Sequence, residues 1–209
     1  MNDTGGYRRN SKKKFDIKPT VSINIKAAIY RVSDITKAPV KDVAEYITAL
    51  VIRDRKAIEH LRPYFKRNYH FDKHSIYFGD ISNQSVVKRN NEEPGERITI
   101  RFKQEDYAII SNLSHALDCT KSRTVAVCLE IGILNIRYVN TYIKNYLRKE
   151  LTEWQMQELH ILMRELRENK GVHHTWAAIL SYVDSTVGPK PNIKETVNDF
   201  LINHWRDQN

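Results

Sequence analysis

The segment KSRTVAVCLEIGIL, residues 121–134, constrains the fold more than any other part of the chain. It has the length of a helix, but its apolar residues lie on nearly every side of that helix: Val125, Val127, Cys128, Leu129, Ile131, Ile133 and Leu134. Such a helix must be buried on more than one face, and a unit of about 40 residues cannot supply that burial alone. We therefore expect the unit that contains it to need a partner copy.

The residues before this helix change their hydrophobic period. Two faces alternate strictly between 97 and 102, with Arg97, Thr99 and Arg101 on one and Ile98, Ile100 and Phe102 on the other. From Gln104 onward, apolar residues recur at helical spacing, at Tyr107, Ile110, Leu113 and Leu117. The pattern predicts a short strand that runs straight into a helix.

The polar face of this strand indicates nucleic-acid recognition. If two such strands pair about a two-fold axis, their apolar faces join the core and Arg97, Thr99 and Arg101 project outward. A two-stranded ribbon fits the major groove of DNA, about 12 Å wide, where arginine donates two hydrogen bonds to guanine and threonine contacts either base type. The alternative is a strand whose arginines merely face water.

The start of the second helix is suited to a phosphate group. Thr120 or Ser122 can cap the helix, and Lys121 and Arg123 add two cations beside its free amides. Base-reading side chains flanked by phosphate contacts would form a coherent DNA-binding surface.

Residues 96–135 resemble the ribbon-helix-helix fold of the MetJ/Arc-type repressors. The resemblance rests on the alternating strand, the spacing from Phe102 to Thr120 and the Ser/Thr-containing turn before an apolar helix. It implies an obligate dimer that reads the major groove through Arg97, Thr99 and Arg101.

Residues 20–52 look like an imperfect second copy. TVSINI alternates, and its outward-facing residues would be Thr20, Ser22 and Asn24, with Lys41 and Lys37 at the phosphate. Two departures count against it: the spacing from Ile25 to Pro39 is short by about one helical turn, and Ala38 offers no cap. If the copy exists, the two units pair either within one chain or with their counterparts in a second chain.

Charge divides the chain into a basic front and an acidic back. The net charge is +9 overall, +12 over residues 1–149 and −3 over residues 150–209. This split favours a polyanionic partner for the front. The expected organisation is a basic disordered arm (1–18), the imperfect unit (19–62), a connector with one short strand at SIYF (63–95), the DNA-binding unit (96–135) and a helical assembly or partner module (136–209) with helices near 152–168, 173–186 and 192–206.

Other groups of residues carry less information. Cys119 and Cys128 read as buried free thiols, and the spacing of His60, His70, Asp72 and His74 matches no known metal-ligand motif. We find no phosphate-binding glycine loop, no nucleophile elbow and no convincing acid pair, and we expect neither enzymatic activity nor a cofactor. No run of apolar residues reaches membrane-spanning length and no signal-peptide pattern is present, so we expect a cytoplasmic, nucleoid- or plasmid-associated protein.

The sequence thus predicts a mainly α protein with short β-ribbon strands, built from one or two ribbon-helix-helix units and a C-terminal helical module. The expected function is sequence-specific binding of double-stranded DNA by a homodimer or higher homo-oligomer, as a repressor in a bacterial or mobile-element operon. An alternative is a plasmid-type accessory factor for transfer or partition whose module 136–209 recruits a second protein. The contrasting class is an assembly module whose basic face is incidental.

Overall fold

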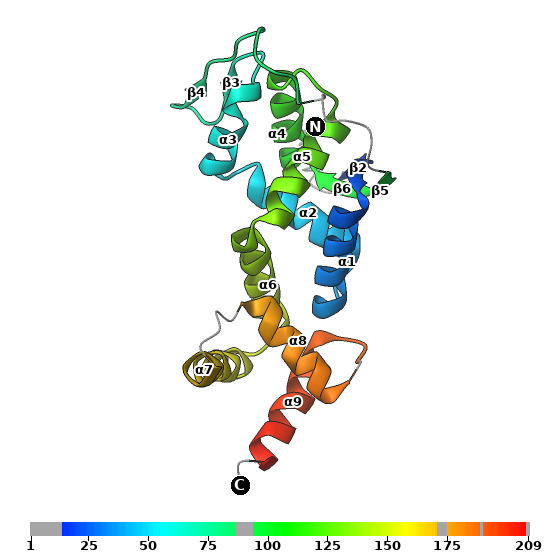
Figure 1. Cartoon of the computed structure of the whole chain (residues 1–209), viewed down its shortest axis with the longest axis vertical. Coiled ribbons are helices and arrows are strands. Elements are labelled where there is room, and N and C mark those ends of the chain that lie inside the picture. Colours follow the sequence, from blue (N-terminus) through cyan, green and yellow to red (C-terminus); the bar gives the residue numbers. More distant parts are fainter. Residues whose placement is uncertain (1–13, 87–93, 171–174, 189, 208–209) are drawn as a thin grey trace, which may run out of the picture.

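The computed structural model describes residues 14–86, 94–170, 175–188 and 190–207 (Figure 1). Within these ranges the protein is mainly helical, with short antiparallel strand pairs, as the sequence predicts. The N-terminal half contains β1 (Lys14–Ile17), β2 (Thr20–Ser22), α1 (Ile23–Thr36), α2 (Val40–Val51), α3 (Arg55–Leu61), η1 (Arg62–Tyr64), β3 (Tyr69–His70) and β4 (Ile76–Tyr77). The C-terminal half contains β5 (Gly95–Arg97), β6 (Ile100–Lys103), α4 (Gln104–Ala116), α5 (Lys121–Leu134), α6 (Ile136–Glu150), α7 (Glu153–Lys170), α8 (Trp176–Val187) and α9 (Ile193–Asp207).

Two strand pairs form one continuous antiparallel ribbon, here called the ribbon, from residues 14–22 and 95–103. β1 pairs with β6 and β2 with β5 in a single register, which places Lys14 opposite Lys103 at one end and Ser22 opposite Gly95 at the other. Pro19 interrupts the ladder because it has no N–H, but its carbonyl accepts from Ile98 N at 3.1 Å and joins the two halves. The strands therefore pair within the chain.

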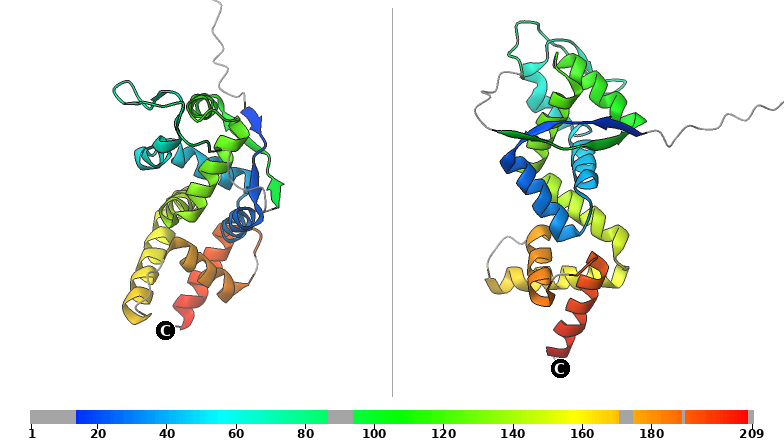
Figure 2. Two further views of the ribbon diagram at one scale, coloured as in Figure 1. Left: turned by 45° about the horizontal axis from the view of Figure 1, so that its top comes forward. Right: turned by 90° about the vertical axis from the view of Figure 1, so that its right-hand side faces the viewer.

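The elements that follow each strand repeat at a constant interval. The starts of α1 and α4, of α2 and α5, and of α3 and α6 are each 81 residues apart. The residues with left-handed backbone between the helices, Lys37 (φ 55°) and Asp118 (φ 51°), keep the same interval. We call residues 14–51 the first repeat and 95–134 the second repeat; α1 and α4 leave the ribbon from opposite ends (Figure 2).

The two repeats share their pattern of buried positions rather than their amino acids. Between residues 14–51 and the aligned residues 95–132, only four positions are identical: Ile17/Ile98, Ala27/Ala108, Ile29/Ile110 and Ser33/Ser114. The buried positions nevertheless coincide along the second helices, where Val43, Ala44, Ile47, Thr48 and Val51 match Thr124, Val125, Cys128, Leu129 and Gly132. Each repeat therefore presents the same faces to a shared interior.

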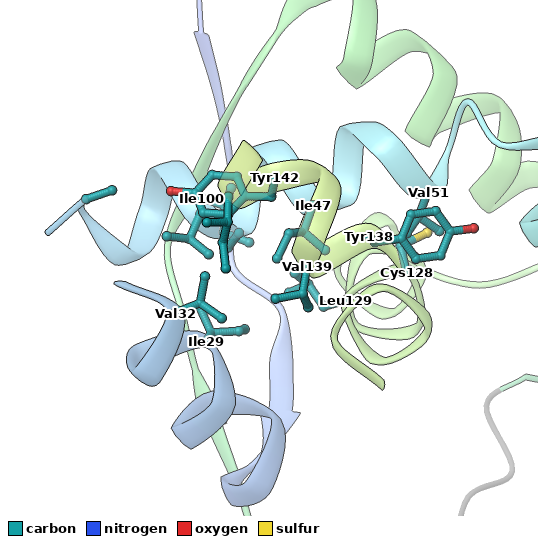
Figure 3. Packing of buried hydrophobic residues seen from close by; sticks show 14 of the residues in the cluster. Ile29, Val32, Ile47, Val51, Ile100, Cys128, Leu129, Tyr138, Val139 and Tyr142 are labelled. Atoms are coloured by element: carbon teal, nitrogen blue, oxygen red, sulfur yellow. The ribbon is translucent and has the colours of Figure 1, made fainter. Parts of the chain in front are cut away.

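The interior explains why α5 can be apolar on nearly all sides. Helix α5 packs against α2 of the first repeat and also against α1, α4, α6 and β2. Ile47 and Val51 of α2 lie beside Cys128 and Leu129 of α5 and the inward face of α6 (Figure 3). The partner copy that the apolar helix requires is thus supplied by the same chain.

The predicted strand over 20–25 is wrong in its boundaries. The helix α1 already begins at Ile23, and Ser22 caps it by accepting from Ile25 N at 3.4 Å. The alternating pattern predicted a strand there, but Val21, Ile25 and Ile29, all buried, also fit the spacing of a helix. Ile23, which a strand would bury with them, is exposed. The paired strand starts at Lys14 instead, so the predicted disordered arm cannot extend to residue 18; residues 1–13 lie outside the described part of the chain.

This shift removes the main objection to a second copy. Val21, and not Ile25, is the last inward-facing residue of the strand. The spacing from Val21 to Pro39 equals the spacing from Phe102 to Thr120, because the interval between the repeats relates both pairs. The first repeat therefore does not lack a helical turn. Its first helical turn begins at Ile23, within the stretch 20–25 that the alternating pattern predicts as strand.

The connector between the repeats forms a small aromatic cluster. The strands β3 and β4 pair antiparallel, and the short strand predicted at SIYF corresponds to β4. Phe65 packs against Tyr69 and Tyr77, so these aromatic side chains form a small core. The backbone amides of Lys66 and Arg67 donate to the Ala116 carbonyl at 2.7 and 3.1 Å, which attaches the connector to the end of α4.

The three helices predicted in the C-terminal region are confirmed as α7, α8 and α9. α8 packs on α1 and α6, and α9 packs on α8 and α7. These helices gather at the lower end of the long axis in Figure 1, whereas the ribbon lies in the upper half. α6 belongs to both parts of the molecule, because it contacts α2 and α5 as well as α7 and α8.

At Gly132, helix α5 of the second repeat lies so close to helix α2 of the first repeat that a side chain would not fit without a shift. A Cβ added there would lie 2.4 Å from Ile47 Cγ2 and 3.0 Å from Val51 Cγ2, both fully buried. We expect Gly132→Ala to destabilise the protein by about 1–2 kcal/mol, because overpacking costs about 1–3 kcal/mol and better helix propensity returns up to about 1. Urea unfolding measures the change. As a control, Ile47→Ala should cost less in the Gly132→Ala background than alone; additive effects would contradict the close contact.

Buried tyrosines predict a loss of stability at alkaline pH. Burial raises the pKa values of Tyr69 and Tyr142 to about 12. The folded state therefore holds protons that the unfolded state releases above pH 10, so stability is complete below pH 10 and falls as the pH rises toward 12. Tyr142→Phe should change little at pH 7 and should reduce the loss at pH 11 by about 1 kcal/mol. Urea unfolding at both pH values tests this, with the exposed Tyr30→Phe as control; equal losses in both variants would contradict it.

Candidate nucleic-acid interface

The ribbon has one buried and one exposed face because successive side chains in a strand point in opposite directions. The buried face contains Ile17, Pro19, Val21, Ile98, Ile100 and Phe102. The exposed face, here called the outward face, contains Lys14, Asp16, Lys18 and Thr20 from one strand and Arg97, Thr99, Arg101 and Lys103 from the other. It carries five cations and one carboxylate, a net charge of +4.

Cross-strand neighbours give the outward face an order. Thr20 lies opposite Arg97, Asp16 opposite Arg101 and Lys14 opposite Lys103. The same register sets Lys18 opposite Thr99 at the centre. The 81-residue interval relates Lys18 to Thr99, so this central pair lies on the approximate two-fold axis that relates the repeats.

The structure brings together the trio predicted in the second repeat. Arg97, Thr99 and Arg101 are all exposed on the outward face. Among the residues that the structure describes, Arg97 makes no ion pair, whereas Arg101 Nε donates to Asp16 Oδ1 at 3.1 Å.

Only one of the three residues predicted in the first repeat lies on the outward face. Thr20 does; Ser22 is half-buried as the cap of α1, and Asn24 is in the first turn of that helix. Asp16 and Lys18 occupy the equivalent positions. The alternation of Phe15, Ile17, Pro19 and Val21 could have revealed them, but the neighbouring lysines and Asp16 made this stretch look like a polar tail.

The residues predicted to hold phosphate at α5 differ in orientation. Thr120 is exposed and accepts from Arg123 N at 3.2 Å, and Lys121 Nζ lies 5.3 Å from the centre of the Tyr107 ring. Ser122 is half-buried. Arg123, by contrast, donates from Nε and Nη2 to the Val86 carbonyl at 3.3 and 3.0 Å, so its guanidinium is directed toward the connector.

The equivalent helix start in the first repeat is less well capped. The missing cap that the sequence predicts is confirmed, but the cap position is Pro39 and not Ala38; Lys41 is exposed. Lys37 is engaged elsewhere, because its Nζ lies 3.0 Å from Asp184 Oδ1 of α8. In the second repeat the corresponding Asp118 pairs with Arg67 at 2.7 Å. Both interhelical turns are thus held by added segments, α8 in one case and the connector in the other.

Ion pairs within and between the repeats connect the ribbon and the helices. Lys26 of α1 pairs with Glu96 of β5, and Lys14 Nζ lies 2.9 Å from Glu45 Oε2 of α2. Arg53, just after α2, lies 2.5 Å from the nearly buried carboxylate of Asp106 in α4. The first two contacts tie one residue of each strand to a helix, and the third joins the segment after α2 to α4.

A groove of about 1430 Å³ lies between α3, residues 81–86 and α5. Lys56, His60, Lys66 and Arg137 line it, and Figure 1 shows α3 on the other side of α5 from the ribbon. At its edge, Tyr138 Oη donates to Asp54 Oδ2 at 2.8 Å. Burial opposes ionisation of Asp54, but the hydrogen bonds from Tyr138 and the Lys56 amide, together with the nearby Arg137 guanidinium, outweigh it and hold the pKa of Asp54 below its usual value.

The histidine-rich stretch forms no metal centre in the described residues, where no group of three or more His, Cys, Asp or Glu side chains could hold an ion. His60 lines the groove, and the Asp72 carboxylate accepts from the His74 amide at 2.7 Å. Both cysteines are free thiols; Cys128 is fully buried, which raises its pKa to about 12, and Cys119 is half-buried. Over the described ranges, none of the helices combines the length and apolarity needed to cross a bilayer.

Comparisons with protein-family models, curated protein sequences and solved structures found no match.

Proposed function

We propose that the two repeats form one ribbon-helix-helix DNA-binding unit of the MetJ/Arc type within a single chain. Three features support the proposal. The strands pair antiparallel, each strand leads into two helices at the same interval, and the second helices α2 and α5 pack together in the core. A fused unit of this kind completes its ribbon without a second protomer, so higher assembly would have to come from other surfaces.

The function that the geometry supports best is sequence-specific binding of double-stranded DNA, as a transcriptional regulator of a bacterial or mobile-element operon. The outward face carries the proposal. Paired strands lie about 4.8 Å apart, so a two-stranded ribbon with its side chains enters a major groove about 12 Å wide. The face that would meet the bases is exposed and has a net charge of +4.

Base reading would come from the inner positions of the outward face. Arg97 and Arg101 have the planar donor pair that matches O6 and N7 of guanine. Thr20 and Thr99 can accept from or donate to base edges, and their methyl groups can contact thymine. Lys18, at the centre of the ribbon, adds a donor that the sequence-based hypothesis lacked.

Phosphate contacts would come from the helix starts. The first amides of α5, together with Thr120, Lys121 and Ser122, can face a phosphate group, and Lys41 offers a cation at the start of α2. Arg123 is the weakest of the predicted phosphate ligands, because it already donates to Val86 O.

A second candidate function, a plasmid-type accessory factor for transfer or partition, is favoured by the C-terminal helices. α7, α8 and α9 bury Leu159, Ile179 and Val197 in a hydrophobic interior that is continuous with that of the repeats. They leave Trp154 and Ile161 exposed on α7, 50% and 39% respectively. Such a module could recruit a second protein while the ribbon stays on DNA.

Selection from genomic and plasmid fragments with the full-length protein, followed by footprinting, tests the function. A preferred site near a promoter of its own operon supports the repressor, and an array beside a transfer origin or centromere-like locus supports the accessory factor. Salt-dependent binding without sequence preference would instead indicate an assembly module with an incidental basic face.

Arg97→Ala and Arg101→Ala should each weaken binding to the selected site by about 1–3 kcal/mol and relax the preference at one base pair, because each removes a guanine reader. Gel shift or fluorescence anisotropy measures the loss. Arg164→Ala, which removes an exposed arginine from α7, is the matched control and should have little effect. If both ribbon variants bind the site as well as the parent, base reading by the ribbon is excluded.

Lys121→Gln and Lys41→Gln should weaken binding to all sequences alike, because phosphate contacts carry no base information. Each should also lower the slope of log affinity against log salt concentration by about 1. Titrations from low to moderate salt, on the selected site and on a scrambled duplex, measure both quantities. An unchanged slope in both variants would place the phosphate contacts elsewhere.

A further inference from the structure

The two ends of the ribbon are chemically unequal. The 81-residue interval relates Asp16 to Arg97 and Thr20 to Arg101, so a symmetric unit would have the same cross-strand pair on both sides of the central Lys18 and Thr99. Instead, one side has Asp16 opposite Arg101 and the other has Thr20 opposite Arg97. Asp16 is the only carboxylate on the outward face.

Asp16 contacts Arg101 through the Nε of the guanidinium group. Arg101 Nε donates to Asp16 Oδ1 at 3.1 Å, and the two side chains remain 61% and 48% exposed. In the part of the chain that the structure describes, the terminal nitrogens Nη1 and Nη2 of Arg101 make no hydrogen bond. The pair therefore fixes the guanidinium while leaving its outer edge available.

Such an exposed ion pair adds little to folding stability, because water screens it. Its effect on recognition can be larger for two reasons. An unrestrained arginine side chain loses much rotamer entropy when it binds a base. A carboxylate that accepts from Nε already restricts the side chain before DNA binds, so less entropy is lost on binding. The attraction also strengthens when DNA displaces the surrounding water. A carboxylate beside the groove further disfavours base edges that present only acceptors.

We propose that Asp16 is a specificity-determining positioning residue that orients Arg101 toward guanine at one half of a non-palindromic site. This inference rests on the proposed DNA-binding function. Asp16 accepts from Nε, and Nη1 and Nη2 donate to O6 and N7 of a single guanine. The other half of the site meets Thr20 and Arg97, which forms no ion pair with any residue that the structure describes, so the two half-sites differ in sequence.

Asp16→Asn, compared with Glu96→Gln, tests the proposal in the full-length protein. Glu96 lies on the neighbouring strand and is half-exposed, but pairs with Lys26 outside the outward face, so both variants lose one negative charge from the ribbon. Affinities are measured for the selected duplex and for duplexes with each base pair of the site changed. We expect Asp16→Asn to reduce discrimination roughly three- to ten-fold at the base pair read by Arg101 and nowhere else. Glu96→Gln should raise affinity for all duplexes alike.

A double-variant cycle links the effect to the proposed contact. In an Arg101→Ala background, Asp16→Asn should no longer alter discrimination at that base pair. The positioning role is overturned if Asp16→Asn changes all affinities equally, as Glu96→Gln does, if its effect persists without Arg101, or if the selected site is a perfect palindrome. DNA binding with sequence preference would survive each of these results, whereas its absence from the parent protein would overturn the proposed function itself.

Discussion

Antiparallel pairing of residues 14–22 with 95–103 is the constraint on which the rest of the structure depends. The two strands lie at the starts of the two repeats, so their pairing brings together segments that are distant along the chain and closes α2 on α5. The close approach at Gly132, where Ile47 and Val51 occupy the space of a side chain, follows from this arrangement. A one-residue slip in the ribbon would turn Ile98, Ile100 and Phe102 toward water, so the buried face fixes the register.

Pairing within one chain changes what the ribbon can present. Two identical protomers related by a two-fold axis must offer identical side chains on both sides of it. A chain that contains both repeats is not bound by this requirement, and here residues 14–51 share only four identical positions with the aligned residues 95–132. The interior keeps matching burial, because both halves must fill one core, while the outward face has diverged to Asp16, Lys18 and Thr20 against Arg97, Thr99 and Arg101.

The same divergence explains why the turns between the helices have different neighbours. Lys37 contacts α8 through Asp184, and Asp118 contacts the connector through Arg67. Each added segment thus covers one of the two equivalent turns. The C-terminal helices are therefore attached at the first repeat and leave the exposed face of the ribbon uncovered (Figures 1 and 2).

The sequence by itself determined the strand and two helices of the second repeat and the three C-terminal helices, because strong periodicity and helix caps are local signals. It showed that the apolar helix of the second repeat needs a partner. It also placed Arg97, Thr99 and Arg101 on one face. Only the tertiary structure decided that the partner lies in the same chain and that the first strand begins at Lys14. Alternation over 20–25 fitted strand and helix equally well, and the choice was made by the pairing of Thr20–Ser22 with β5, a contact too distant along the chain for any local pattern to reveal.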